Sequence, residues 1–330
     1  MRTLLWILAA LMAALVAGIA FVTWQYRQTL ETPLPLSKAQ TIHIKAGTSA
    51  YRLVRELQEK GWVKSRWPYK VFVKLHPELA DIRAGCYAVE PGMRPQQLLA
   101  NAAAGKEQTF LATLVDGEKF SQWLSYLQSL PELRADKLSK QQLAAKLGVD
   151  NPEGWLMPDT YQYRCGDDAL SILTQAHDAM TAYLATVWPK REDGLPFEDS
   201  YQALIMASIV EKETAAPKER PLIASVFINR LQKGMRLQTD PTVIYGLGDK
   251  YDGNITRADL KTPTPYNTYV IKGLPPTPIA MPSRASIDAV LHPDSADYLY
   301  FVAKGDGTHV FSKTLREHIN AVNRYQRGHK

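Results

Sequence analysis

The first feature that limits the fold is an uncharged, strongly apolar run near the N-terminus, residues 4–24. A helix rises about 1.5 Å per residue, so a run of this length spans the ~30 Å hydrocarbon core of a bilayer. The sequence therefore predicts one transmembrane anchor over residues 4–24. Arg2 precedes the run and Arg27 follows it, so the charge bias toward a cytoplasmic N-terminus, residues 1–3, is slight.

A cleaved signal peptide is the alternative, because Gly18-Ile19-Ala20 resembles a small-residue cleavage site. The apolar region of a signal peptide usually has only ~7 to 15 residues, which favours the uncleaved anchor. No second apolar run follows, so the rest of the chain is expected to fold on one side of the membrane. Residues 25–40 carry two prolines and little periodicity, which is typical of an extended linker.

Composition argues against several kinds of site. The two cysteines, Cys86 and Cys165, match no metal-ligand spacing, and the sequence leaves open whether they form a disulfide. The seven histidines include no HExxH pair, and nucleotide-binding glycine loops are also missing. We therefore expect no metal and no cofactor. The net charge of +6 is spread along the chain and forms no basic cluster. Nucleic-acid binding is therefore only a weak alternative, and we expect no nucleic-acid partner.

Residues 41–125 are predicted to form a small α+β region. A strand over 41–49, helices over 49–61 and 65–75, and a strand over 84–92 follow one another. This order resembles a LysM domain, a small module that binds N-acetylglucosamine polymers, and a small spacer without a ligand is the alternative. A further helix, strand and helix complete the region as one domain or two.

Two glutamates end a predicted buried helix that begins near residue 203. On a helical wheel Glu213 continues the apolar stripe of Met206 and Ile209, whereas Glu211 lies about 200° away, so the two carboxylates cannot form a close dyad. Partial burial of Glu213 would raise its pKa toward the range of a general acid. The alternative is that both glutamates are solvated at a fraying helix end.

Two further segments are rich in prolines, aromatic rings and polar groups, residues 152–163 and 263–282. Aromatic rings offer apolar faces to sugar rings, and carboxylates accept hydrogen bonds from hydroxyls. Residues 152–163 suit neither a helix nor a regular strand, so a loop is predicted that either packs for shape or lines a binding site. A proline-stiffened segment as long as 263–282 is costly to order unless it shapes a site.

The motifs EGWLMPDTY, SIVEKET, VFINRL, LQTDPTVIYG, YNTY and GLPPTPI, behind an anchor and a LysM-like unit, resemble the YceG-like family of endolytic murein transglycosylases. The resemblance covers nearly the whole chain. It implies an α+β fold with a lysozyme-like mixed catalytic domain over residues 126–330. It also implies a lyase that cleaves the MurNAc-β-1,4-GlcNAc bond of nascent peptidoglycan without water, leaves 1,6-anhydroMurNAc ends and terminates glycan elongation.

The resemblance carries the catalytic glutamate over to Glu213, which the helical wheel also favours. One carboxyl group can protonate the glycosidic oxygen and then remove a proton from the C6 hydroxyl that attacks the anomeric carbon. Glu211 is expected to form a salt bridge. Sugar binding or orientation of the acid, with a role in holding the fold as the alternative, is expected of Gln238, Asp240, Tyr245, Tyr266, Asn267, Glu153, Asp159 and Tyr161. If Asp240 faced Glu213 across a water, the reaction would be inverting hydrolysis.

The resemblance also implies a location and partners. We expect a single-pass inner-membrane protein with its catalytic body in the periplasm, with peptidoglycan glycan strands as substrate and peptidoglycan synthases as partners. The alternatives are a non-catalytic, membrane-anchored peptidoglycan-binding scaffold and a peptidoglycan hydrolase (muramidase). The C-terminal hairpin and basic helix are predicted to add little chemistry, with His309 and His318 structural or solvated.

Overall fold

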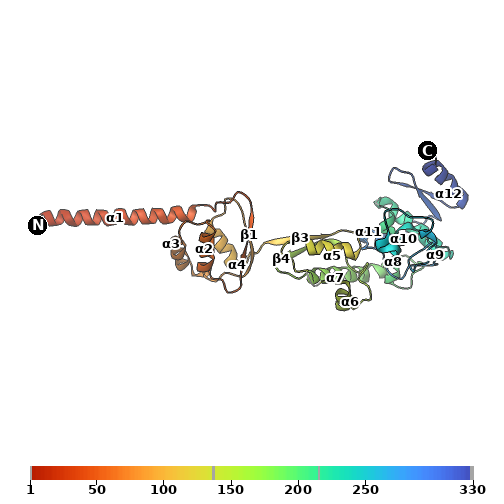
Figure 1. The fold of residues 1–330 in the computed structure, drawn as a ribbon, viewed down its shortest axis with the longest axis horizontal. Helices are drawn as coiled ribbons and strands as arrows, with labels where there is room; N and C mark the ends of the chain where they lie inside the picture. Colours follow the sequence, from red (N-terminus) through yellow and green to blue (C-terminus); the bar gives the residue numbers. More distant parts are fainter. Residues whose placement is uncertain (1, 136–137, 215, 328–330) are drawn as a thin grey trace. The chain divides into compact units, whose positions relative to one another are not determined.

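The computed structural model describes residues 2–135, 138–214 and 216–327 (Figure 1). Contacts divide the chain into two compact units, Met1–Phe110 and Leu111–Lys330. The strand β3 (Thr109–Leu114) spans this division. The domain boundary after residue 125 stays a prediction. Both units combine helices with two-stranded sheets, which confirms the α+β class.

The first unit begins with one long helix, α1 (Arg2–Glu31). Among the described residues, it is the one helix long and apolar enough to cross a membrane, which is compatible with the predicted anchor. The helix runs into the segment predicted as an extended linker. It does so because Leu30 and Leu34 are buried in the core of the unit, and that burial stabilises the last turn of the helix.

A β-α-α-β arrangement follows, as the sequence predicts. Its elements are β1 (Gln40–Ile44), α2 (Ala50–Glu59), α3 (Trp67–Leu75), the 3-10 turn η1 (Pro77–Leu79), β2 (Gly85–Val89) and α4 (Pro95–Ala104). Strands β1 and β2 are antiparallel, with Gln40 opposite Val89. Helix α2 begins where the Ser49 hydroxyl accepts the backbone N–H of Arg52, and its apolar side is fully buried.

The second unit opens with a two-stranded sheet covered by helices. Its elements are β3 (Thr109–Leu114), α5 (Phe120–Ser129), α6 (Lys140–Leu147), β4 (Asp159–Arg164) and α7 (Ala169–Val187). The loop predicted over residues 152–163 is wrong in its second half, where β4 pairs with β3. Thr160 and the tyrosines favour a strand, and Tyr163 is buried by the pairing.

The core of the second unit surrounds α8 (Ser200–Glu213). Every residue from Ala203 to Val210 is buried, because α9 (Arg220–Gln232), α10 (Asp240–Leu247) and α11 (Arg284–Leu291) all pack against α8. Short 3-10 turns connect these helices, at Trp188–Lys190, Pro217–Glu219, Gly248–Lys250 and Asp259–Lys261. The two glutamates of α8 therefore stand where the helix emerges from the core.

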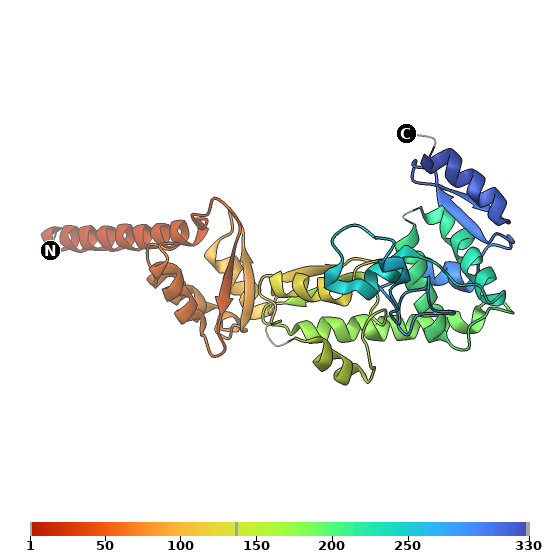
Figure 2. The same ribbon diagram turned by 45° about the vertical axis from the view of Figure 1, so that its right-hand side comes forward.

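The described chain ends with a hairpin and a helix, as predicted (Figure 2). Strands β5 (Tyr300–Ala303) and β6 (His309–Ser312) are antiparallel and precede α12 (Leu315–Val322), which continues as a π-helical turn over Asn323–Arg327. The hairpin packs on α9, where the Phe227 and Phe301 ring centroids are 5.8 Å apart. This contact brings the end of the chain to the same region as the end of α8.

Candidate active site

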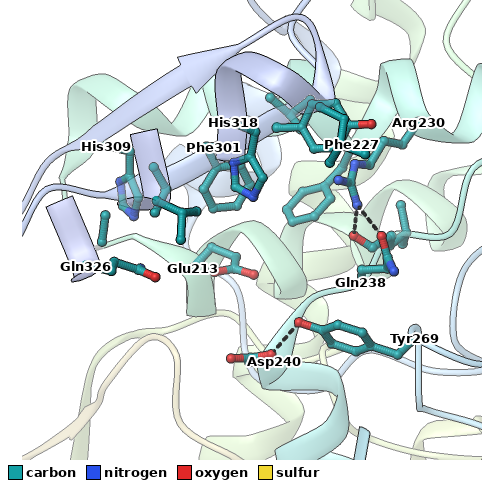
Figure 3. A pocket seen from close by; sticks show the side chains of 17 residues that line it. Glu213, Phe227, Arg230, Gln238, Asp240, Tyr269, Phe301, His309, His318 and Gln326 are labelled. Carbon is teal, nitrogen blue, oxygen red and sulfur yellow. Dashed lines mark hydrogen bonds between the residues drawn. The ribbon is translucent and has the colours of Figure 1, made fainter. Parts of the chain in front are cut away.

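Glu213, the last residue of α8, lines a pocket of about 480 Å³ (Figure 3). The other walls come from α9, from the segment that leads into α10, and from the C-terminal hairpin and helix. Residues that line it with Glu213 include Arg230, Gln238, Asp240, Tyr269, His309 and His318. Of the sequence-predicted site residues, the pocket therefore brings together Glu213, Gln238 and Asp240.

Thr239 makes the closest contact to the Glu213 carboxyl group. Its hydroxyl donates a hydrogen bond to Oε1 of Glu213, and only 2% of the residue is exposed. Thr239 also precedes α10, where a threonine hydroxyl usually accepts a backbone N–H of the first turn. No such cap bond forms here. Both neighbours of Thr239 are predicted site residues, whereas Thr239 is not, because its role depends on contact with the end of α8, 26 residues away.

The environment of Glu213 keeps its proton bound at higher pH than usual. Burial raises the pKa of Glu213 to about 7, and the nearby charge of Asp240 adds to the rise. The hydrogen bond from Thr239 and the proximity of His309 act in the opposite direction and lower this pKa. Near neutral pH both the protonated and the ionised form of Glu213 are therefore populated, which suits a group that must both give and take a proton.

Asp240, the first residue of α10, is held by Tyr269 across the pocket. The Tyr269 hydroxyl donates a 2.6 Å hydrogen bond to Oδ1 of Asp240 (Figure 3). Burial and this hydrogen bond raise the pKa of Tyr269, so the phenol stays a donor. Asp240 itself is exposed and so can contact a ligand in the pocket.

Arg230 of α9 links two walls of the pocket, the hairpin of β5 and β6 and the segment that leads into α10. It is 7% exposed, its Nε donates to the Leu299 carbonyl at 2.7 Å, and its Nη1 donates to the Leu237 carbonyl at 2.7 Å. Gln238, which follows Leu237, has φ 55°. Residues other than glycine seldom adopt this left-handed conformation unless the surrounding structure stabilises it. Arg230 Nη1 also lies 3.4 Å from Oε1 of Gln238, so the arginine contacts both Gln238 and the carbonyl that precedes it.

Glu211 has the structural role expected of it. Its Oε1 lies 3.2 Å from Arg220 Nη2, and its Oε2 accepts the Ser283 backbone N–H at 2.8 Å. The predicted salt bridge is confirmed. Because Glu211 faces the start of α11 while Glu213 faces Thr239, the opposite orientations expected from the helical wheel are confirmed as well.

Three of the predicted residues form a partly buried network outside the pocket of Glu213. Glu153, 3% exposed, accepts the Phe120 backbone N–H at 2.8 Å and the Tyr245 hydroxyl at 3.1 Å. Burial raises the pKa of Glu153. The Tyr245 and Tyr266 ring centroids are 4.8 Å apart, and the Tyr266 hydroxyl lies 2.9 Å from Thr277 Oγ1. These contacts correspond to the fold-holding alternative.

The remaining predicted residues form hydrogen bonds or an ion pair with other residues of the chain. Asn267, 1% exposed, donates from Nδ2 to the carbonyls of Asp259 and Thr262 at 3.0 and 2.8 Å, and so fixes its loop. The Tyr161 hydroxyl donates to the Met157 carbonyl at 2.7 Å. Asp159 is exposed and lies 3.7 Å from Arg284. None of the three lines the pocket of Glu213.

The C-terminal region contributes more to the pocket than the sequence predicts. His309 lies 2.7 Å from Glu219 through Nδ1, as expected for a structural residue, yet it also lines the pocket. The His318 ring stacks on Tyr300 with centroids 5.2 Å apart. Burial, together with the charge of Arg230, lowers the pKa of His318, so the ring is neutral near pH 7. No pattern in the sequence indicates that this distant segment meets α8.

Comparison with known proteins places the chain in a family. The sequence profile of the YceG-like family matches residues 42–324. The chain belongs to the YceG-like family. Its similarity to named YceG-like proteins extends over most of its length, beyond the motifs around Glu213.

Relatives from two bacterial species carry the name endolytic murein transglycosylase. The protein of that name from Bacillus subtilis strain 168 is 33% identical over 94% of this chain and 91% of its own length. The one from Streptococcus pneumoniae serotype 2 is 27% identical over 90% of this chain, which spans 62% of that relative. The crystal structure of a putative YceG-like protein from Listeria monocytogenes superposes with a TM-score of 0.55 at 31% identity, covering 86% of this chain and 99% of that one.

Proposed function

We propose that this protein is an endolytic lytic transglycosylase that cleaves the MurNAc-β-1,4-GlcNAc bond of nascent peptidoglycan strands and ends their elongation. The observation that carries the proposal is Glu213, a single carboxyl group with a pKa near 7 at the wall of a polar pocket. The names of the relatives from Bacillus subtilis and Streptococcus pneumoniae support the same activity.

Glu213 supplies both proton transfers of the reaction. In its protonated form it gives its proton to the glycosidic oxygen, and the bond from that oxygen to the anomeric carbon of MurNAc breaks. The resulting carboxylate then takes the proton of the MurNAc C6 hydroxyl, whose oxygen bonds to the anomeric carbon and closes the 1,6-anhydro ring. The proton that leaves Glu213 is thus replaced within one turnover, and no water is consumed.

The neighbours of Glu213 have separate tasks in this scheme. The Thr239 hydroxyl holds Oε1 and stabilises the carboxylate formed after the first transfer. Asp240, oriented by Tyr269, and Gln238 offer hydrogen-bond partners to sugar hydroxyl and acetamido groups. The aromatic side chains of Tyr300 and Phe301 add apolar surface to the pocket wall.

Two substitutions beside Glu213 are expected to shift the pH dependence in opposite directions. The reaction starts from protonated Glu213, so kcat/KM falls as pH rises through its pKa of about 7. Asp240→Asn removes a charge that raises this pKa, and the fall should move to lower pH. Thr239→Val removes a hydrogen bond that lowers it, and the fall should move to higher pH. Initial rates measured from about pH 5 to about pH 9 test both shifts, and shifts in the same direction would contradict the assignment.

Membrane anchoring completes the proposal. We place α1 across the inner membrane with the remaining chain in the periplasm, close to newly made strands and to peptidoglycan synthases as partners. The antiparallel β1–β2 pair with α2 and α3 between its strands supports a LysM-like, glycan-binding role for the first unit. The buried helix α8, ending in its acid, supports a lysozyme-like catalytic core in the second.

Product analysis tests the proposed reaction directly. The full-length protein in detergent is incubated with uncrosslinked peptidoglycan strands, and the new ends are identified by mass spectrometry. Internal cuts with 1,6-anhydroMurNAc ends are expected. Reducing ends would indicate a hydrolase and would make Asp240 the candidate base, because it lines the same pocket as Glu213. Strands bound but left intact would indicate a scaffold.

A further inference from the structure

Helix α3 carries an apolar stripe that the first unit leaves uncovered. The side of the helix that faces the core is formed by Pro68, Tyr69 and Val73. The apolar stripe, spaced four residues apart, consists of Trp67, Val71 and Leu75, which are 39%, 40% and 67% exposed. A single exposed apolar side chain is ordinary, but three in line along one helix indicate a surface that another body covers.

A row of basic side chains runs along the apolar stripe. Arg66, Lys70 and Lys74 are all exposed, and each directly precedes a stripe residue, so the row lies about 100° around the helix. A helix with an apolar edge that includes tryptophan and an adjoining basic edge suits the interface of a bilayer with anionic headgroups. The row gives the surface a charge complementary to lipid phosphates.

The contacts of α3 with α1 set its distance from the apolar run. The Tyr26 and Trp67 ring centroids are 6.2 Å apart, and the Tyr69 hydroxyl donates to the Thr29 carbonyl at 2.9 Å. Tyr26 follows the end of the run at Trp24 by two residues, or about 3 Å along the helix. The headgroup layer on each side of a bilayer is roughly 5–7 Å thick. If α1 spans a bilayer, Trp67 therefore lies at headgroup depth.

The views of the first unit agree with this placement. In both Figure 1 and Figure 2, α3 lies on the side of the unit nearest to the N-terminal part of α1. That side faces the bilayer when α1 crosses it. At this depth lipid is the neighbour of α3, which favours a lipid surface over a protein partner as the body that covers the apolar stripe.

We propose that α3 docks the first unit onto the surface of the membrane that α1 spans, with the apolar stripe among the headgroups and the basic row on anionic lipid phosphates. This inference rests on the membrane anchoring in the proposed function and is independent of the glycan chemistry. Docking fixes the height and tilt of the first unit above the bilayer, where a spanning helix alone would leave the unit free to swing.

Quenching of Trp67 by lipid tests the docking. The full-length protein is reconstituted in nanodiscs containing phosphatidylglycerol with brominated acyl chains, and wild type is compared with Trp67→Phe. Because the chain has seven tryptophans, the difference between the two emission spectra isolates Trp67. Bromine is expected to quench this difference signal. An unquenched Trp67 in protein that has entered the discs would overturn the proposal.

Charge reversal separates docking from mere proximity. The double variant Lys70→Glu, Lys74→Glu should lower the ratio of docked to undocked first units in anionic discs by at least about tenfold, read as a loss of Trp67 quenching. Each basic residue near such a surface contributes about fivefold to this ratio. The matched control reverses Lys45 and Lys106, exposed lysines outside α3, and should leave Trp67 quenched. Equal quenching in both variants would overturn the role of the basic row.

Two further measurements distinguish this proposal from the proposed function. Wild type should co-float with the same lipids as vesicles, and failure to do so would overturn both anchoring and docking. In detergent the Lys70/Lys74 variant should still cut free strands to the 1,6-anhydroMurNAc ends expected of wild type, because neither lysine lines the pocket of Glu213. A loss of Trp67 quenching with cleavage retained would therefore concern the lipid surface of α3 alone.

Discussion

Replacing Glu213 with glutamine is expected to lower the rate of strand cleavage by at least roughly 10³-fold. General acid or base catalysis typically contributes ~10²–10⁴-fold, and here both proton transfers depend on the same group. The amide of Glu213→Gln keeps the shape of the side chain and can still accept the hydrogen bond from Thr239, but it cannot exchange a proton at neutral pH. Mass spectrometry of anhydroMurNAc ends over time measures the loss.

Thermal unfolding provides the control for Glu213→Gln. The folded-state pKa of Glu213, about 7, lies above its ordinary value of 4.5. At low pH Glu213 is protonated in both the folded and the unfolded chain. As pH rises from about 4.5 to about 7, the unfolded chain releases this proton more readily than the folded one, so the wild type loses stability. The glutamine variant avoids this cost and should be more stable than wild type at pH ~8 by about 1–3 kcal/mol. A variant that still cleaved at near the wild-type rate would remove Glu213 from the mechanism.

Replacing Arg230 with alanine is expected to produce the largest loss of stability. The change leaves the Leu237 and Leu299 carbonyls without their donor and opens a cavity between α9 and the hairpin. A cost of about 3 kcal/mol follows, equivalent to a fall in Tm of roughly 6–12 °C for a body of this size. Activity should fall with it even at temperatures where the protein stays folded, because Gln238 in the pocket wall loses its contact with Arg230.

Arg284→Ala is the matched control for Arg230→Ala. Arg284 forms an ion pair with Asp159 at 3.7 Å, but both side chains are 55% exposed, unlike the buried Arg230. An exposed pair of this kind contributes about 0–1 kcal/mol, so Tm should hardly change. Calorimetry of both variants in the same detergent makes the comparison. Similar small shifts for the two arginines would show that Arg230 does not hold the pocket together.

The parts of the fold that depend on local sequence could be predicted. The apolar spacing of α2 and the burial of Ala203–Val210 lie within single helices, and periodicity indicates them directly. The opposite directions of Glu211 and Glu213 follow from helix geometry alone. The strand β4 was harder to predict, because its partner β3 lies far away in the sequence and the prolines before it suggest a loop.

The parts of the site that depend on distant segments could not be predicted. Thr239 and Arg230 acquire their roles only when α8, α9 and the hairpin meet. Glu153 and Tyr245 were selected for their chemistry, which a buried structural network uses as readily as a sugar site does. A sequence lists polar groups, but it does not state which of them end up hydrogen-bonded to each other.

The contact between Arg230 and Leu299 also means that the pocket is completed late in the synthesis of the chain. Helix α8 and the segment around Thr239 leave the ribosome well before the hairpin of β5 and β6, which closes one wall of the pocket. Until that hairpin arrives, Arg230 keeps its bond to the Leu237 carbonyl but lacks the Leu299 carbonyl, and the side of the pocket opposite Glu213 stays open to water. The pocket around Glu213 is therefore complete only after the β5–β6 hairpin has folded onto α9.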